Sequence, residues 1–171
     1  FISRNLLPTA IYKLELDGTG DGFNVNVGAI YKPMENLWVG ATYRATTNVE
    51  FEGDVKIAGV YVATGKTTLP MPGVFTVGAA YELTPELTVE GDVQYTQWSE
   101  YHRLTIDFNR TLAQLGGIRQ LSELKNWNDQ VTMRAGAEYT LDPQITLRAG
   151  VIADLSPQPP SRTEPMLPDG D

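Results

Sequence analysis

The residues best suited to chemistry are few in this 171-residue chain, and their spacing argues against catalysis. The only histidine, His102, follows Ser99 by three residues. On a strand these two side chains would point to opposite faces, so they could not form a local nucleophile–base pair. One histidine and no cysteine also leave the segment without the ligands of a structural zinc site. We therefore predict that the protein is not an enzyme and that it uses no metal and no cofactor.

Two short motifs resemble ion or phosphate loops but fail in their details. Residues 17–22 (DGTGDG) begin like a calcium loop, yet the twelfth position is Gly28, where a bidentate glutamate is required. Residues 65–67 (GKT) resemble the end of a phosphate-binding loop, but five residues instead of four separate them from Gly59. We interpret the first motif as a polar surface turn and the second as part of a loop.

The remaining candidates surround one long segment, residues 109–126. Its leucines and isoleucines recur at near-helical spacing, which predicts an amphipathic loop. Such a loop either presents an apolar groove to a hydrophobic ligand or, if the strands of the chain form a barrel, packs on its rim. Aromatic residues beside it could line a ligand path or anchor a wall at the membrane interface, and a lysine could meet a carboxylate. The ligand-path candidates are Trp98, Tyr101, Phe108, Leu112, Leu115, Lys125 and Trp127.

Composition narrows the classes of protein that could carry these residues. A net charge of −8 and a pI near 4.6 argue against nucleic acid as a partner. No run approaches the roughly 18 apolar residues of a transmembrane helix, but strands of a membrane barrel hide their hydrophobicity by alternating it. The chain opens at Phe1 and closes on a proline-rich, charged tail, and we interpret both ends as cuts through a longer protein.

A strand–turn–strand unit repeats three times along the chain. Gly28-Ala29-Ile30-Tyr31, Gly78-Ala79-Ala80-Tyr81 and Gly136-Ala137-Glu138-Tyr139 each precede a short proline-containing turn and a second strand. The predicted hairpins cover about 22–47, 73–106 and 129–155. Long loops are expected at about 1–21, 53–73, 107–128 and 156–171. Short turns at one end and long loops at the other are typical of outer-membrane barrels.

Side chains alternate strictly in these hairpins, with an apolar face and a face that carries charges of both signs. Either a soluble β-sandwich or a membrane barrel could produce this pattern. Tyrosines at the strand ends and an apolar face built from small residues favour the barrel, with the charges in its lumen. If Leu141 faces Ile145, Glu138 lies opposite Arg148 as an ion pair. The predicted lumenal charges are Arg44, Glu90, Asp92, Arg134, Glu138, Arg148 and Asp154.

These motifs together resemble the FadL/TodX-type outer-membrane transporters of long-chain fatty acids and hydrocarbons. The similarity rests on residues 22–31 (GFNVNVGAIY), 39–44 (VGATYR), 94–101 (QYTQWSEY), 127–129 (WND) and 154–159 (DLSPQP), in that order. It implies an all-β, antiparallel transmembrane β-barrel of fourteen strands, of which about six lie here and the N-terminal hatch does not.

The resemblance further implies a monomer of the bacterial outer membrane that contacts lipid or detergent. Its ligands would be hydrophobic small molecules that cross by passive diffusion. A porin or adhesin barrel of other specificity, and a soluble β-sandwich binding module, stay open as alternatives at this point.

Overall fold

The computed structural model describes residues 14–154, which form β-strands joined by short turns and two single-turn 3-10 helices. Within these residues no helix is long and apolar enough to cross a membrane. The 3-10 helices are η1 (Trp98–Glu100) and η2 (Ala113–Leu115). The strands are β1 (Leu14–Asp21), β2 (Asn26–Met34), β3 (Leu37–Arg44), β4 (Thr47–Ile57), β5 (Val60–Met71), β6 (Val74–Thr84), β7 (Leu87–Thr96), β8 (Arg103–Leu112), β9 (Ile118–Leu124), β10 (Gln130–Asp142) and β11 (Ile145–Asp154).

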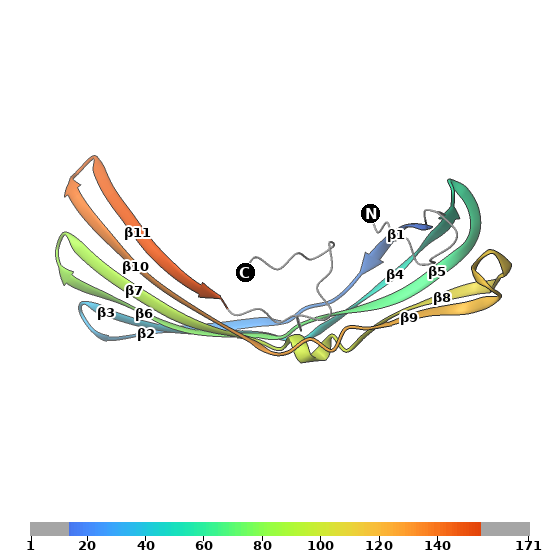
Figure 1. Ribbon diagram of the computed structural model, residues 1–171. Coiled ribbons are helices and arrows are strands. Elements are labelled where there is room, and N and C mark those ends of the chain that lie inside the picture. The colour runs from blue at the N-terminus through green and yellow to red at the C-terminus, as the bar shows by residue number, and fades with distance from the viewer. Residues whose placement is uncertain (1–13, 155–171) are drawn as a thin grey trace.

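The strands form one antiparallel meander that is divided crosswise into two sheets. The five-stranded sheet has the order β1-β4-β5-β8-β9, and the six-stranded sheet has the order β11-β10-β7-β6-β3-β2. Consecutive strands such as β3 and β4 continue from one sheet into the other, so the described chain makes six long passes. The two sheets lie end to end and curve toward the same side (Figure 1). The prediction of an all-β antiparallel wall of about six strands is confirmed.

The three predicted hairpins supply all six strands of the six-stranded sheet, although the second was drawn too long, because η1 begins at Trp98 and β8 at Arg103. Polar residues close the turns of the second and third hairpins. Asp142 Oδ1 accepts hydrogen bonds from the backbone N–H groups of Gln144 and Ile145 at 2.8 and 3.0 Å. Thr84 Oγ1 accepts in the same way from Glu86 and Leu87. Asp and Thr next to proline therefore satisfy backbone donors that the turn leaves without a ladder partner.

The predicted pairing of Glu138 with Arg148 is confirmed by the register of β10 and β11. The premise about the turn was wrong by one residue, because Asp142 rather than Leu141 lies opposite Ile145. The ladder shifts between Thr140 and Asp142, where the turn-capping aspartate is drawn into the pairing. From Thr132 to Thr140 the expected register holds.

The apolar face of the six-stranded sheet is open rather than covered. Large apolar side chains that alternate along it are exposed, and no second sheet packs on it among the described elements, whose main contacts join hydrogen-bonded neighbours. The sandwich alternative is therefore wrong, because a sandwich would bury this face. The exposed residues of this face include Val27, Tyr31, Val77, Val93, Met133, Leu147 and Val151.

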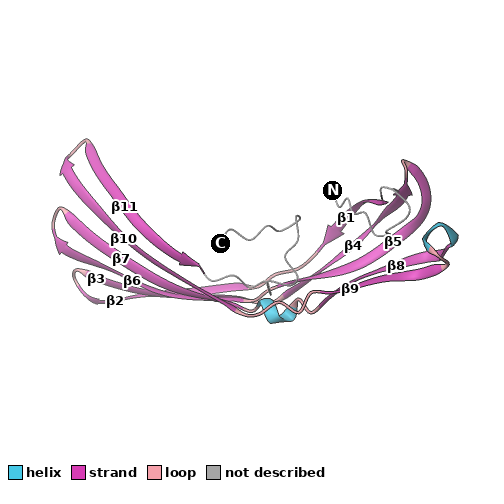
Figure 2. Ribbon diagram, viewed as in Figure 1, coloured by secondary structure: helices cyan, strands magenta, loops and turns pink. Residues whose placement is uncertain are grey.

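The five-stranded sheet corrects the predicted loops. Residues within 53–73 and 107–128 form the β4–β5 and β8–β9 hairpins, and residues 14–21 form β1 (Figure 2). The β4–β5 turn is Ala58-Gly59, both with positive φ, as a two-residue hairpin turn requires. Alanine rarely adopts that conformation, and the turn carries neither the Asn-Gly nor the Asp-Gly pair that predicts such a hairpin from sequence. The predicted loops at 1–13 and 155–171 lie outside the described residues.

The motif at residues 17–22 is mostly strand rather than a surface turn. In β1, Asp17 lies opposite Asp54 and Gly18 lies opposite Gly53 on β4. A Cβ on Gly18 would meet the Glu52 carbonyl oxygen at 2.5 Å, and one on Gly53 would overlap the Asp17 carbonyl. The two glycines therefore permit a close approach of the backbones, a role that the interpretation as a polar surface turn did not include.

The buried core lies in this five-stranded sheet. The predicted amphipathic helix-like loop is wrong, because its leucines belong to a hairpin in which Ile106 faces Leu121 and Leu112 faces Ile118. Gly116 and Gly117, both with φ of +80°, reverse the chain between them. The core consists of Val55, Ile57, Val62, Ala63, Ile106, Phe108 and Leu112, with Leu16, Leu115, Ile118 and Leu121 packed against it.

Candidate functional site

The six-stranded sheet forms a trough of about 1290 Å³ along the face opposite to its exposed apolar face, which we call the apolar belt. Alternate residues of its strands line this trough, because neighbouring strands pair with like-facing side chains opposite each other. One lateral row runs from Ile30 through Gly40 and Gly78 to Asp92 and Arg134. The row has small or apolar side chains on β2, β3 and β6 and charges on β7 and β10, and it continues to Ile152 on β11, opposite Arg134.

The charged half of the trough is held by pairs between neighbouring strands. Arg134 Nη1 lies 2.8 Å from Asp92 Oδ1, and its Nη2 donates to Gln94 Oε1 at 3.2 Å. Arg148 Nε lies 2.6 Å from Glu138 Oε2. The first pair is the less exposed of the two, with side chains 37% and 31% exposed against 72% and 44%. Both arginines are thus already engaged by carboxylates.

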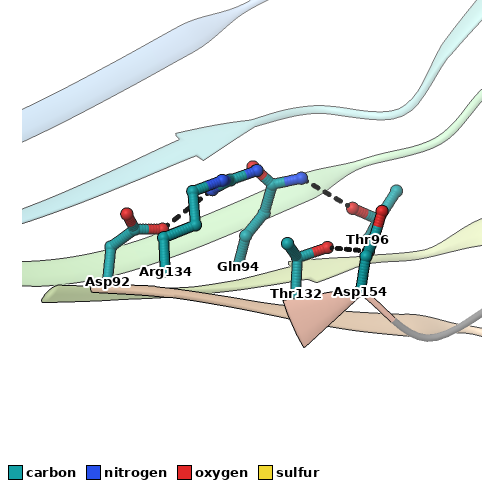
Figure 3. Close-up of polar contacts among 6 residues, drawn as sticks. All are labelled: Asp92, Gln94, Thr96, Thr132, Arg134 and Asp154. Atoms are coloured by element: carbon teal, nitrogen blue, oxygen red, sulfur yellow. Dashed lines mark hydrogen bonds and ion pairs between the residues drawn. The ribbon is translucent and has the colours of Figure 1, made fainter. Parts of the chain in front are cut away.

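Polar side chains extend this network toward the end of β11. Asp154 Oδ1 accepts hydrogen bonds from Thr132 Oγ1 at 2.6 Å and from Gln130 Nε2 at 2.7 Å. Gln94 Nε2 donates to Thr96 Oγ1 at 3.2 Å. The side chains rise from the same face of the sheet, with Arg134 lying between Asp92 and Gln94 (Figure 3).

Two further predicted charges lie at the margins of this network. Glu90 lines the trough and faces Gly136, where an added Cβ would meet its carboxylate oxygen at 3.2 Å. Arg44 is exposed at the end of β3, opposite Asn26. Of the seven predicted lumenal charges, the structure therefore joins Asp92 with Arg134 and Glu138 with Arg148, and it hydrogen-bonds Asp154 to polar neighbours.

The apolar half of the trough contains residues that the sequence reading missed. Ile30 and Trp38 line the trough although the alternation assigns that face to polar or small residues. Ile30 is 80% exposed, and it lies opposite Gly40, while Trp38 lies opposite Ala80. The alternation itself is the signal that could have found them, because Ile30 and Trp38 are large and apolar while Gly28, Lys32 and Gly40 on the same face are small or charged.

Three of the predicted ligand-path residues meet at the junction of the two sheets. The Trp98 and Trp127 rings have centroids 4.9 Å apart, and the Tyr101 ring lies 5.2 Å from Trp127, both in edge-on geometry. Tyr101 and Trp127 are buried. Lys125 is buried as well, with its Nζ 3.5 Å from Glu123 Oε1. These residues lie where the ladder of backbone hydrogen bonds between the strands is interrupted.

The interruption has a cause in the sequence. Pairing between β5 and β8 is limited to residues 65–67 with 106–108, whereas β6 and β7 pair again from Val74 with Thr96. Pro70 and Pro72 stand in the gap and have no N–H to donate. The opposite strand fills the space with η1, which bulges out of the ladder and carries Trp98 into the aromatic contact.

Asp129 holds this bulge in place. Its Oδ1 accepts the Ser99 backbone N–H at 2.9 Å, and its Oδ2 accepts the Tyr95 hydroxyl. Hydrogen bonds from Ser99 and then from Tyr95 lower the pKa of Asp129 below its usual value. The carboxylate thereby ties β7 and η1 to the start of β10. It was not among the predicted site residues, although it closes the Trp127-Asn128-Asp129 motif.

The other three predicted ligand-path residues lie elsewhere. Phe108 and Leu112 are buried in the core of the five-stranded sheet, and Leu115 packs against it. The seven candidates therefore form two groups rather than one continuous path. Among residues 14–154, no group of three or more histidine, cysteine, aspartate or glutamate side chains is arranged to hold a metal ion.

Comparison with known proteins places this geometry in a family context. Residues 5–171 match a family model described as outer membrane protein transport protein (OMPP1/FadL/TodX). The long-chain fatty acid transport protein of Escherichia coli O6:H1 (strain CFT073) is 27% identical over 159 residues, which cover 75% of this chain and 34% of that protein. The 47 kDa outer membrane protein of Pasteurella multocida (strain Pm70) is 23% identical over 150 residues, covering 78% and 34%. The chain thus spans about a third of the length of these relatives.

Solved structures show the same fold. A Pseudomonas aeruginosa FadL homologue superposes with a TM-score of 0.72 at 20% identity, covering 86% of this chain and 36% of that one. The CymD monoaromatic hydrocarbon channel superposes with a TM-score of 0.60 at 18% identity, covering 87% and 44%. The open, curved sheets described above are therefore a segment of β-barrel wall.

Proposed function

Because the chain belongs to the OMPP1/FadL/TodX family of outer membrane transport proteins, we propose that the whole protein carries hydrophobic molecules across the outer membrane. The ligands we propose are long-chain fatty acids or hydrocarbons, in keeping with the names of the relatives. The prediction that the protein is not an enzyme agrees with this family of transporters. The prediction of an outer-membrane location is confirmed on the same grounds.

One observation supports transport most directly, namely the two-sided construction of the six-stranded sheet. Its outer face is an exposed apolar belt that suits lipid or detergent, and its inner face is an open trough that suits a passing molecule. In water such a large exposed apolar face would be unfavourable, whereas in a membrane it contacts lipid. We propose that the protein acts as a monomer, which light scattering in detergent tests.

We propose that transport is passive. Half of the trough wall consists of glycine, alanine and threonine with Ile30 and Trp38, so an apolar molecule can move along it without breaking ion pairs. The aromatic group at the sheet junction (Trp98, Tyr101 and Trp127), with the neighbouring Lys125, is proposed to border the path. Phe108, Leu112 and Leu115 are proposed to support it from the core of the five-stranded sheet.

The test uses the full-length protein in the outer membrane and then in proteoliposomes. Unheated and heated gel samples establish that the barrel is closed, and labelled oleate and toluene are then offered to cells with and without the protein. Uptake that depends on the protein, and that persists in proteoliposomes containing only albumin as a sink, supports passive transport. Entry of sugars but not of oleate or toluene would replace this proposal with a porin for polar solutes.

A further inference from the structure

We propose that Trp38 and Lys32, at the turn end of the trough, form a binding site for the carboxylate of an amphiphilic molecule, with its chain lying along the apolar half. This inference rests on the proposed function, and it selects carboxylated amphiphiles over neutral hydrocarbons. The proposed site does not include the aromatic group at the sheet junction. The observations that support it are the direction of Trp38, the position of Lys32 and the distribution of charge in the trough.

Trp38 points into the trough and not toward lipid. Tyrosines that suit the membrane interface, such as Tyr31 and Tyr81, lie on the other face, because Tyr31 pairs with Val39 and Tyr81 pairs with Leu37. Trp38 is the next residue along β3 and therefore faces the opposite way. An interfacial anchor would need the lipid-facing parity, so the anchoring role that commonly explains tryptophan at a membrane edge does not apply here.

The surroundings of Trp38 offer an apolar platform. Ile30 lies opposite Gly40, one step along the trough, and Ala80 lies opposite Trp38 on β6. Gly40 has only Ile30 and a backbone oxygen within 4 Å of an added Cβ, both at 3.8 Å, so the surface above it is open. An alkyl chain can therefore lie on the glycine floor with Ile30 and Trp38 against its sides.

Lys32 adds the charge that fits a carboxylate. Its Nζ lies 4.5 Å from the centroid of the Trp38 ring, and within residues 14–154 no carboxylate forms an ion pair with it. The ammonium group has three donors, and a ring face satisfies the charge without consuming them all. A carboxylate that approaches this end of the trough would thus meet a cation that is already held over an aromatic surface.

The rest of the trough directs an anion toward this end. The two arginines that line it are paired with Asp92 and Glu138, and Glu90 lies in the same lateral row as Trp38 but two strands away. With strands about 4.8 Å apart, that separation is roughly 10 Å. A carboxylate placed on the β7–β10 side would meet three acidic residues, whereas Lys32 offers a cation beside the apolar floor.

The experiment measures binding to the full-length protein in detergent micelles. A bromine-labelled stearate quenches tryptophan fluorescence on contact, and its methyl ester serves as the neutral probe of the same shape. We expect Trp38→Phe to remove a component of the quenching. We expect Lys32→Gln to weaken binding of the acid by about threefold to fivefold, as for a partly exposed charge pair, and to leave binding of the ester unchanged.

Lys66→Gln is the matched control, because Lys66 carries the same charge but pairs with Glu52 on the five-stranded sheet. Its affinity for both probes should equal that of the wild type. Unheated gel migration verifies that each variant is folded. Equal effects of Lys32→Gln on acid and ester, or no effect of either variant while oleate uptake persists, would overturn this site alone. A wild-type protein that neither binds the acid nor takes up oleate would overturn the proposed function together with the site.

Discussion

The guanidinium group of Arg134 on β10 lies 2.8 Å from the carboxylate of Asp92 on β7, directly across the strand ladder. The pair lies in the charged half of the trough, with Gln94 as a second acceptor for the same guanidinium (Figure 3). A charge that bridges two strands from inside a barrel ties them together without occupying the lipid-facing side. The stability of this wall should therefore depend on Arg134 more than on charges at its rim.

We predict that Arg134→Ala lowers the free energy of unfolding by about 1–2 kcal/mol, because it leaves the half-buried Asp92 without its cation. Arg148→Ala is the matched comparison, and its more exposed pair with Glu138 should cost about 0.5 kcal/mol. Urea unfolding of the full-length protein in detergent measures both. In a double-mutant cycle with Asp92→Ala, additive effects would show that the pair contributes nothing of its own.

The orientation of the six-stranded sheet can be tested with one charge placed on either face. Val93 lies on the exposed apolar belt, and Thr76 lines the trough. We predict that Val93→Lys costs about 2–4 kcal/mol at the membrane midplane and reduces the amount of protein in the outer-membrane fraction. Thr76→Lys should assemble normally and keep its heat-dependent gel shift. The reverse result would place the trough on the lipid side.

The core of the five-stranded sheet should behave like that of a water-soluble protein. Leu112 is 1% exposed, and Leu112→Ala should cost about 2–5 kcal/mol because the cavity cannot be refilled. Leu124→Ala, at a position 46% exposed, should cost less than about 1 kcal/mol. Hydrogen exchange of the β8 and β9 amides measures the difference. Equal protection in both variants would contradict the assignment of these strands to one packed core.

The Asp129 clamp should respond to acid. Because hydrogen bonds from Ser99 and Tyr95 lower its pKa, the stabilisation it provides is complete above the ordinary pKa of aspartate, about 3.9, and is lost as the pH falls through the lowered value. We predict that trypsin or another protease cleaves near η1 faster in Asp129→Ala at pH 7. With an acid-tolerant protease, the wild type should be cleaved as fast as the variant only in acid. A variant with wild-type cleavage at both pH values would exclude the clamp.

The wall of the trough was predictable because strand alternation is a local property. Side chains one residue apart point to opposite faces whatever the rest of the fold does, so Val93 and Met133 could be assigned to one face and Asp92 and Arg134 to the other. The pairing of Glu138 with Arg148 followed in the same way, since a short turn leaves few possible registers. Even the one-residue error at Leu141 stayed confined to the turn.

The five-stranded sheet was not predictable from the same signal. Leu112, Leu115 and Ile118 are three residues apart, as on a helix, but the chain reverses between them at Gly116 and Gly117, and both strands then direct their leucines to one core. Periodicity measures spacing along one continuous element, so it cannot detect a reversal inside the window. The Ala58-Gly59 turn was hidden for a related reason, because its conformation is set by the pairing of β4 with β5.

The sequence by itself determined the number of passes through the wall, the two faces of the six-stranded sheet and the register of its last hairpin, since these depend on neighbours in the chain. Only the tertiary structure decided which side chains meet. It joined Trp98 and Tyr101 to Trp127, moved Phe108 and Leu112 into a separate core, and set Lys32 over Trp38 inside the trough. Contacts of this kind depend on strand pairing and on breaks in the ladder, which bring residues together across distances that no local pattern records.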